Sequence, residues 1–503
     1  MANPDIIVIG AGHNGLVAAA YLARAGRKVL VLERSDVPGG QLASGMLGAG
    51  CDAPALHPGG QLRPDIVRDL GLAQHGLATT DAADAPYVAL LADGGALRLT
   101  SRGSDPATLQ AIRRHSSRDA ARWPEFVAFM NAAAGFVDAA YRTPMPRMER
   151  SEMLANGLPL ASLLLRLRGL GRKDMFRVIR SLSMSAQEFT DDWFEAEPLK
   201  AAIGALAVHG VTLGAYSAGT GYTLMHNWLN RGGLAHGRGG ASITDALVAA
   251  IRKSGGEVRC SEPVATILVD KQQVTGVRLA SGEEIAAPRV ISAADPRHTL
   301  LGLVGAPELP PEFVWHTQSI RMRGSVAKVH LLTDGSHGLP DGTLVVAPTL
   351  RYIEQAYDAS KYGEISRAPY LEVTTSGTTV SIHFQFASFR LRQADWASER
   401  ATLESRAVDT LAAHAPALRA SIREVRSITP LDLEQHWGLT EGDLNHGQLI
   451  LDQVLFMRPM PGWSDHRTPV DGLYLGGSGV HGGGGISGAA GRNAARAVLK
   501  AKA

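Results

Sequence analysis

Cysteine is nearly absent from this chain: Cys51 and Cys260 are the only two among 503 residues. Two cysteines so far apart in sequence exclude a disulfide framework, and no Cys-X-X-Cys or zinc-ligand spacing accompanies them. We therefore expect no metal site. A reducing compartment fits this composition, which favours a cytoplasmic location.

An excess of charge of one sign is also missing. The formal net charge is +2, and lysine supplies only nine of the 50 basic residues. This balance gives no electrostatic reason to expect nucleic-acid binding. Long apolar runs are absent too, since none reaches the roughly 18 residues of a membrane-spanning helix. The first strand begins by Asp5, so we expect no signal peptide.

Glycine, by contrast, is abundant. The 56 glycines are about 11% of the chain, against roughly 7% in average usage, and no Gly-X-Y repeat runs through them. Of these glycines, 25 lie in three short segments, residues 1–60, 232–240 and 476–491. Glycine is needed where the backbone takes a positive φ or approaches a ligand closely. Three such segments, far apart in sequence, suggest one ligand that all three contact.

The first segment has the pattern of a dinucleotide-binding βαβ unit. An apolar run at residues 5–9 predicts a buried strand, residues 16–25 predict a helix, and residues 28–33 predict a second strand. The motif Gly-X-Gly-X-X-Gly lies between the first strand and the helix. The full context of strand, turn, helix, strand and terminal acid makes this motif specific.

Each glycine of the motif has a physical role. Gly10 permits the turn, Gly12 lets the backbone approach a pyrophosphate, and Gly15 lets helix and strand pack closely. The N-terminus of the helix supplies unpaired N–H groups to the phosphates. Glu33, at the end of the second strand, is able to accept hydrogen bonds from a ribose diol.

The residues after Glu33 carry a family resemblance. Arg34 is followed by Gly39-Gly40-Gln41, and this order is similar to the flavoprotein superfamily that joins amine oxidases, phytoene desaturases and retinol-saturase-like enzymes. The resemblance implies FAD as the cofactor, with the Gly-Gly pair along its diphosphate. Many members carry Arg where Gln41 stands, so this chain departs from the pattern there.

The two other glycine segments extend the resemblance. The strand at Val264 and the end of the Ala-Ala-Asp-Pro stretch at Ala293 resemble the family's adenine-side and cofactor-proximal segments; a plain αβ unit is the alternative for this region. In the last segment, the resemblance places a strand end near the ribityl chain and a glycine-rich turn at the N1/O2 edge of the flavin. The corresponding residues are Gly477, Ser478, Gly484, Gly485 and Ile486.

Residues 441–458 narrow the resemblance to phytoene-dehydrogenase-like proteins of the pyridine-nucleotide-disulfide-oxidoreductase-domain type 2 branch. The name of that branch does not fit disulfide chemistry in this chain. A disulfide reductase needs a redox cysteine pair and a second nucleotide-binding fold, and the sequence has neither. The resemblance is weakest between residues 75 and 230.

Three residues are candidates for catalysis. Lys328 lies in Gly-Ser-Val-Ala-Lys, which resembles the amine-oxidase segment whose lysine holds a water at flavin N5; a surface lysine is the alternative. His57 follows the Gly-Gly pair where the family's chain passes the flavin, and His481 lies inside the flavin turn. Either histidine is a candidate acid or base, with a structural hydrogen bond as the alternative. His209, His226 and His330 are weaker candidates.

Residues 158–182 combine leucine with arginine. A basic amphipathic segment of this kind is able to lie on an anionic membrane. The alternative is a helix whose leucines pack inward and whose arginines are solvated.

We therefore expect an α/β protein in which a Rossmann-type FAD-binding domain (residues 1–74, 232–300 and 440–503) is interleaved with a substrate domain of mixed sheet and helices (residues 75–231 and 301–439). The expected activity is hydride removal from a C–H bond of an apolar or amphipathic small molecule, with isoprenoid-like substrates favoured. A flavin amine oxidase, marked by an aromatic pair flanking the flavin, and a non-redox flavoprotein, isomerase or binding protein, are the alternatives. The electron acceptor and the oligomeric state stay open.

Overall fold

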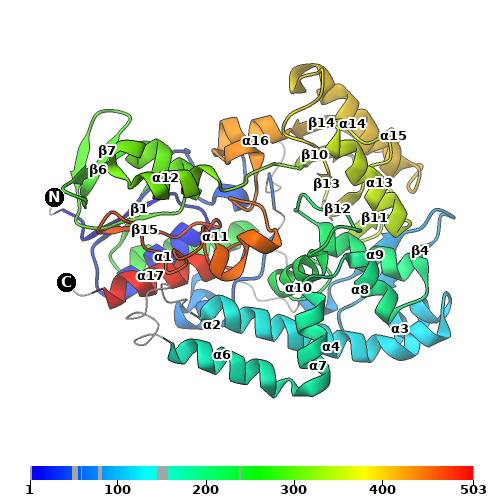
Figure 1. Cartoon of the computed structure of the whole chain (residues 1–503). Helices are drawn as coiled ribbons and strands as arrows, with labels where there is room; N and C mark the ends of the chain where they lie inside the picture. The colour runs from blue at the N-terminus through cyan, green and yellow to red at the C-terminus, as the bar shows by residue number, and fades with distance from the viewer. Residues whose placement is uncertain are drawn as a thin grey trace.

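Two lobes lie side by side, each built around its own β-sheet, and both chain termini lie on the first lobe (Figure 1). The computed structural model describes residues 3–47, 55–57, 59–77, 82–143, 157–236 and 240–501. Within those residues, no helix is long and apolar enough to cross a membrane.

The first lobe is organised by a five-stranded sheet in the order β15-β9-β1-β2-β5. Every neighbouring pair is parallel, as the short apolar runs predict for strands buried on both faces. The helices α1, α11 and α17 cover the sheet and pack against one another. The bounds are β1 Ile6–Ile9, β2 Val29–Leu32, β5 Glu257–Arg259, β9 Val290–Ser292, β15 Leu473–Leu475, α1 His13–Arg24, α11 Gly240–Lys253 and α17 Ala489–Lys500.

A small antiparallel sheet, β6-β7-β8, covers the other face of the first lobe. Its strands are β6 Val264–Asp270, β7 Gln273–Leu279 and β8 Glu284–Ala286, and α12 (Pro311–Gln318) lies beside it (Figure 1). Phe313, Ile320 and Met322 pack into the same hydrophobic cluster as Ile7 of β1. This packing extends the core of the first lobe to Met322, beyond the predicted domain boundary at residue 300.

The second lobe contains a seven-stranded sheet in the order β14-β10-β13-β12-β11-β3-β4. The pair β11–β3 is parallel and the others are antiparallel, which confirms the expected mixed sheet. The strands are β3 Tyr87–Leu90, β4 Ala96–Leu99, β10 Val326–Thr333, β11 Thr343–Val346, β12 Leu371–Ser376, β13 Thr379–Gln385 and β14 Ile422–Ile428.

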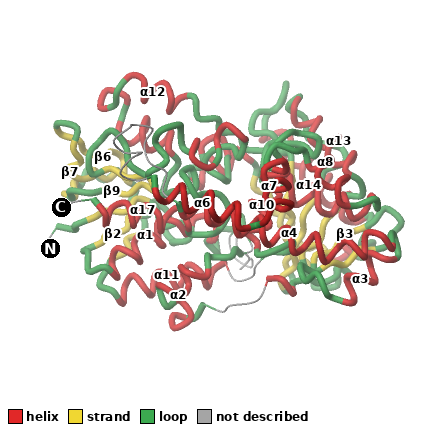
Figure 2. The backbone as a smooth tube through the Cα atoms, turned by 60° about the horizontal axis from the view of Figure 1, so that its bottom comes forward, coloured by secondary structure: helices red, strands yellow, loops and turns green. Residues whose placement is uncertain are grey.

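Helices pack around this sheet in two groups (Figure 2). The larger group shares an aromatic core in which Trp123, Phe126 and Phe129 are buried. Trp193, Phe194 and Trp228 contact these rings edge-on or tilted. The helices are α3 Pro106–Arg113, α4 Ser117–Arg142, α6 Leu158–Gly169, α7 Gly171–Ser181, α8 Ala186–Trp193, α9 Glu197–Val208, α10 Thr220–Arg231, α13 Leu350–Lys361, α14 Trp396–Ala412, α15 Leu418–Ser421 and α16 Pro430–Trp437. The short helix α2 (Pro64–Asp69) instead packs through Ile66 into the core of the first lobe.

Candidate active site

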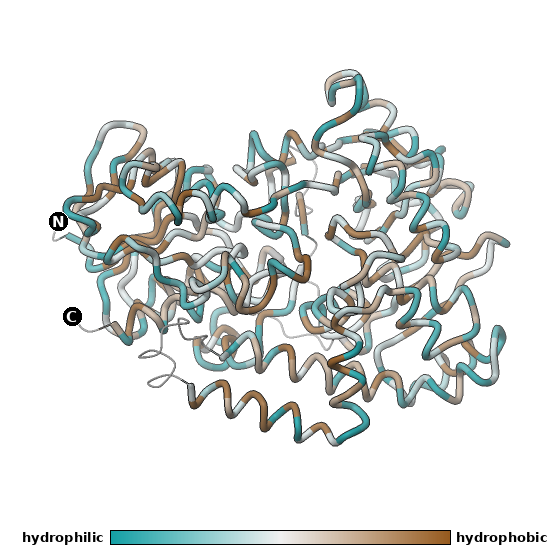
Figure 3. Tube along the Cα trace, in the orientation of Figure 1, coloured by the Kyte–Doolittle hydropathy of each residue, from teal (hydrophilic) through white to brown (hydrophobic). Residues whose placement is uncertain are grey.

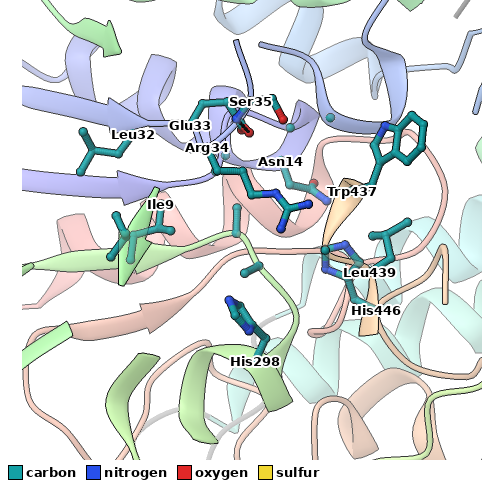
Figure 4. Close-up of a pocket in the computed structure, with 18 of the residues that line it drawn as sticks. Ile9, Asn14, Leu32, Glu33, Arg34, Ser35, His298, Trp437, Leu439 and His446 are labelled. Atoms are coloured by element: carbon teal, nitrogen blue, oxygen red, sulfur yellow. Dashed lines mark hydrogen bonds between the residues drawn. The ribbon is translucent and has the colours of Figure 1, made fainter. Parts of the chain in front are cut away.

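A cavity of about 300 Å³ opens at the carboxyl ends of β1 and β2, where ligands bind in parallel α/β sheets (Figure 4). The first and last glycine-rich segments line it, whereas the described residues of the second segment do not: Gly232 lies against Gln61 and Gly233 against Ser101. Predicted cofactor residues among its lining are Gly10, Gly12, Gly15, Glu33, Arg34, Gly40, Gln41, Val264, Ala293 and Ser478.

The turn after β1 shows why each of its glycines is required. Gly10 has φ +93°, which L side chains rarely adopt. A Cβ on Gly15 would lie 2.0 Å from the carbonyl oxygen of Gly10, so α1 starts in direct contact with the turn. A Cβ on Gly12 would meet no atom within 4 Å and would project into open space. Gly12 therefore leaves room for a ligand rather than for the protein.

Glu33 and the Gly39-Gly40 pair bind this turn from the other side. Glu33 accepts hydrogen bonds from the backbone N–H of Ala11 at 2.6 Å and of Ser35 at 2.9 Å. The N–H of Gly39 donates to the carbonyl of Ala11 at 2.9 Å. Figure 4 shows Glu33, Arg34 and Asn14 gathered in the middle of the cavity. A carboxylate oxygen has more than one lone pair, so Glu33 retains acceptor capacity for a diol.

Several polar groups along this cavity have no hydrogen-bond partner among the described residues. They are His13 Nε2, Trp437 Nε1 and His446 Nδ1. Buried polar atoms are normally paired, so unpaired ones around a cavity indicate a polar ligand. A neutral His13 fits this setting, because burial lowers its pKa to about 4. The open space over Gly12 and these unpaired atoms fit the diphosphate and ribose portion of FAD.

The sequence reasoning missed His13, Asn14, Trp437 and His446. Asn14 occupies a variable position of the glycine motif, yet its Nδ2 donates to Ser478 Oγ at 3.1 Å and joins the first and last glycine segments. Trp437 is the last residue of α16, and His446 lies in the segment that follows this helix. No spacing pattern connects them to the motif, so only the folded chain brings them together.

The glycine-rich turn at residues 482–486 packs on α10. A Cβ on Gly484 would lie 2.7 Å from the ring of His226, and one on Gly485 would lie 3.0 Å from Asn230. Both glycines have positive φ, +99° and +63°. Ile486 contacts Gly60, and Gly477 lies against the carbonyl of Ala293, where a Cβ would be 2.5 Å from the oxygen. The turn is thus fixed by α10 of the second lobe on one side and by Gly60 and Ala293 of the first lobe on the other.

Lys328 lies in the middle of β10 and is buried, which excludes the surface alternative. It stands opposite His383 of β13, and its Nζ is 3.0 Å from His383 Nδ1. Burial lowers the pKa of Lys328 to about 7, with Glu372 opposing the shift and Arg231 adding to it. An amine of that pKa is able to exchange a proton near neutral pH.

The three histidines proposed for this region have different surroundings. His57 is partly exposed, and its ring lies 6.1 Å from the ring of His236. The positive charge of Lys328 is close enough to contribute to lowering the pKa of His57. The Nε2 of His481 instead faces the carbonyls of Ala140 and Thr143, a structural contact with the end of α4. A catalytic role for either residue stays a prediction. His330 bonds Ser381 and the carbonyl of Ala55.

The family model for flavin containing amine oxidoreductases matches residues 15–395. The chain is 32% identical to the rat "Pyridine nucleotide-disulfide oxidoreductase domain-containing protein 2", over 99% of this chain and 93% of the relative. It is 25% identical to the lycopene-forming phytoene desaturase of a Paracoccus species, over 98% and 96%. Cyclohexylamine oxidase from Brevibacterium oxydans has a similar fold, with a TM-score of 0.56, 17% identity and 99% of both chains covered.

The chain therefore belongs to the flavin containing amine oxidoreductase family. It is an FAD-dependent oxidoreductase, and the predicted superfamily, cofactor and fold class are confirmed. Relatives named as desaturases and as amine oxidases both occur, so the comparisons leave the bond that is oxidised open.

Proposed function

We propose that this protein removes a hydride from a C–H bond of an apolar or amphipathic substrate, and that a proton leaves the neighbouring carbon, so that a C=C bond forms. Bound FAD supplies the hydride acceptor, and the protein binds, orients and excludes water. The observation that carries this choice over amine oxidation is the set of rings beside Lys328. Among the described residues they are the imidazoles of His57, His209, His236 and His383, and none of these four makes a ring contact with a described tyrosine or tryptophan.

The proposed cofactor contacts follow the cavity. The turn at Gly10, Gly12 and Gly15 would hold the diphosphate with Gly40, and Glu33 would accept from the ribose hydroxyls. Val264 would line the adenine, and Ser478 the ribityl chain. The turn at Gly484–Ile486 would present backbone N–H groups to the flavin edge.

The decisive experiment is an anaerobic bleaching screen of the purified yellow protein against isoprenoids, aliphatic amines and lipid alcohols. We expect an isoprenoid or another apolar or amphipathic compound with a hydrocarbon chain to bleach the flavin bands. Bleaching by amines alone would replace the proposal with amine oxidation. A flavin that no compound reduces would support a non-redox role, and a protein that cannot be reconstituted with FAD would refute the whole assignment.

We also propose that α6 and α7 contact an anionic membrane, from which such a substrate would be drawn. The helix α6 has no buried residue, and Leu158, Leu164 and Leu165 are 81%, 67% and 69% exposed. Figure 3 shows this hydrophobic helix along the outer edge of the molecule. Arg166 and Arg168 of α6 and Arg172 of α7 are exposed and form no ion pair with a described residue, which leaves their charge available to acidic head groups.

A further inference from the structure

A cluster of seven ionisable side chains is gathered at the junction of the two lobes. The cluster joins the sheet of the second lobe to the segment at residues 55–57, which follows the Gly-Gly pair. The backbone N–H of His57 in this segment donates to the carbonyl of Gln41, a residue that lines the cofactor cavity. Five of the seven side chains are buried, and His57 and His236 are partly exposed. The members are His57, His209, Arg231, His236, Lys328, Glu372 and His383.

Glu372 is the centre of this cluster. Both of its oxygens accept from the guanidinium of Arg231, at 2.9 and 3.1 Å, and Oε1 also contacts His236 Nε2. Burial alone would raise the pKa of the Glu372 carboxyl, but Arg231 and His236 hold it well below its usual range. Glu372 and Arg231 are therefore both ionised, and their charges cancel.

The orientation of Lys328 is fixed through two residues of β13. The side-chain amide of Gln385 donates from Nε2 to the carbonyl of Val211 at 2.7 Å, and its Oε1 accepts from the N–H of Gly210 at 2.9 Å. Because Oε1 is an acceptor, His383 Nε2 at 2.8 Å must carry the proton. His383 Nδ1 is then a lone pair, and Lys328 Nζ donates to it. Lys328 keeps its other N–H groups for a further partner.

The net charge of the cluster is zero or positive near neutral pH. Burial, together with the neighbouring cations, holds the pKa of His57, His209 and His383 well below the ordinary value, and burial also lowers the pKa of His236, so these four rings are neutral. The remaining charge is that of Lys328. In addition, His209 Nδ1 is buried, lies 3.4 Å from Glu372 Oε1 and makes no hydrogen bond with a described residue. A site with this charge attracts an anion and repels a second cation.

We propose that this cluster binds the polar head of the substrate, and that the head is a carboxylate rather than an ammonium. The inference rests on the proposed function, because it assigns the substrate class of the same site. The carboxylate would accept from Lys328, with the rest of the substrate directed past His57 toward the cofactor. Binding a charged partner is what offsets the cost of burying this amine.

A metal ion is the competing occupant, since ligand atoms of His209, His236 and Glu372 lie within 4.8 Å of one another. Two observations argue against it. Both oxygens of Glu372 are already engaged by Arg231, and a divalent ion would add to the positive charge of Arg231 and Lys328. A bound carboxylate, by contrast, would leave the hydrogen bonds between Glu372 and Arg231 intact.

The test uses three probes with one chain length: octanoate, octylamine and 1-octanol. We expect octanoate to bind the holoprotein most tightly at pH 7, measured by calorimetry and by the difference spectrum of the oxidised flavin. Lys328→Met should weaken octanoate binding about tenfold or more, since a hydrogen bond to a charged group contributes about 1.5–3 kcal/mol. The control Lys361→Met, at a lysine paired with Asp358 on the surface, should leave it unchanged.

Octylamine binding as tightly as octanoate, or Lys328→Met binding octanoate like the wild type, would overturn the proposal. So would a stoichiometric metal that is lost in His209→Ala. If Lys328→Met does not fold, the pH dependence of octanoate binding to the wild type replaces it. For this comparison the bleaching screen also contains fatty and isoprenoid carboxylic acids. Octanoate binding without flavin bleaching by any of these compounds would refute the proposed function alone. Bleaching by a hydrocarbon without octanoate binding would refute the head-group site alone.

Discussion

At the scale of single residues, Gly12 separates ligand binding from folding. Its φ is −69°, and an added Cβ would meet no protein atom within 4 Å. Gly12→Val should therefore leave the apoprotein as stable as the wild type while its side chain fills the diphosphate position. We expect FAD retention to fall at least tenfold, measured from the ratio of flavin to protein absorbance.

Gly135→Val is the matched control for this change. Gly135 lies on the exposed side of α4 and also has nothing within 4 Å of an added Cβ. Thermal unfolding of both apoproteins should be similar, with the control raised slightly, because valine has a higher helix propensity than the glycine it replaces in α4. A Gly12→Val protein with full flavin content would show that the diphosphate does not lie over this turn.

Lys328 gives the site a pH dependence of known sign. Its pKa is about 7, below the ordinary 10.5, so raising the pH through 7 removes the positive charge that an anion needs. We expect the octanoate affinity to be constant below about pH 6 and to fall above pH 7, and the fall to be absent in Lys328→Met. The charged and titratable groups that face Lys328 are His383, Glu372, Arg231, His57, His209 and His236. An affinity that rises with pH would contradict the assignment.

The residues of the cofactor turn could be predicted because their chemistry depends on neighbours in sequence. Gly10, Gly12, Gly15 and Glu33 lie in one βαβ unit whose geometry is local. Glu372 has no such signal: it meets Arg231 from 141 positions away. Long-range contacts of this kind depend on how α10 packs on the sheet of the second lobe, which no spacing in the sequence encodes.

At the scale of elements, Gly15 tests the contact between the turn and α1. An added Cβ would lie 2.0 Å from the carbonyl oxygen of Gly10, and this neighbour is backbone, so α1 must shift. Gly15→Ala should lower the free energy of unfolding of the apoprotein by about 1–3 kcal/mol, as overpacking of a tight core does. The contrast with Gly12→Val is the check: thermal unfolding of the apoproteins should separate the two variants, and equal stability would contradict this packing.

The elements themselves could be predicted where their hydrophobic pattern is regular. The alternation at residues 378–386 predicts the strand β13, and Val380, Ile382 and Phe384 do face a hydrophobic cluster. The polar positions of the same strand are nevertheless buried, because His383 and Gln385 face Lys328 and the loop after α9. Alternation indicates two different faces of a strand, but it does not distinguish a solvated face from a buried polar site.

At the scale of the whole molecule, the two lobes are each assembled from segments far apart in the chain. The first glycine segment predicts one lobe, because its alternation of strand, helix and strand is typical of a parallel sheet covered by helices. The boundary near residue 300 could not be predicted, since residues 301–322 have no nucleotide-binding motif and join that lobe only through buried side chains such as Phe313. The leucine and arginine pattern of residues 158–182 is compatible with a membrane-surface helix and with a helix whose leucines pack inward. The exposed leucines of α6 favour the membrane-surface helix.

The surface of α6 and α7 makes the last prediction, which concerns how the whole molecule meets a bilayer. We expect the protein to sediment with vesicles of phosphatidylcholine and phosphatidylglycerol, and less with phosphatidylcholine alone or at high salt. Leu164→Ser combined with Leu165→Ser should reduce the bound fraction about tenfold or more, because each leucine loses apolar area that would enter the acyl region. Trp315→Ser, which removes a 63% exposed side chain from α12 on the other lobe, should bind like the wild type. Vesicle binding that is unchanged in the double leucine variant would contradict the prediction, because another surface would then contact the membrane. A wild-type dimer that dissociates in this variant would also contradict it, because this face would then be a contact between two copies of the chain.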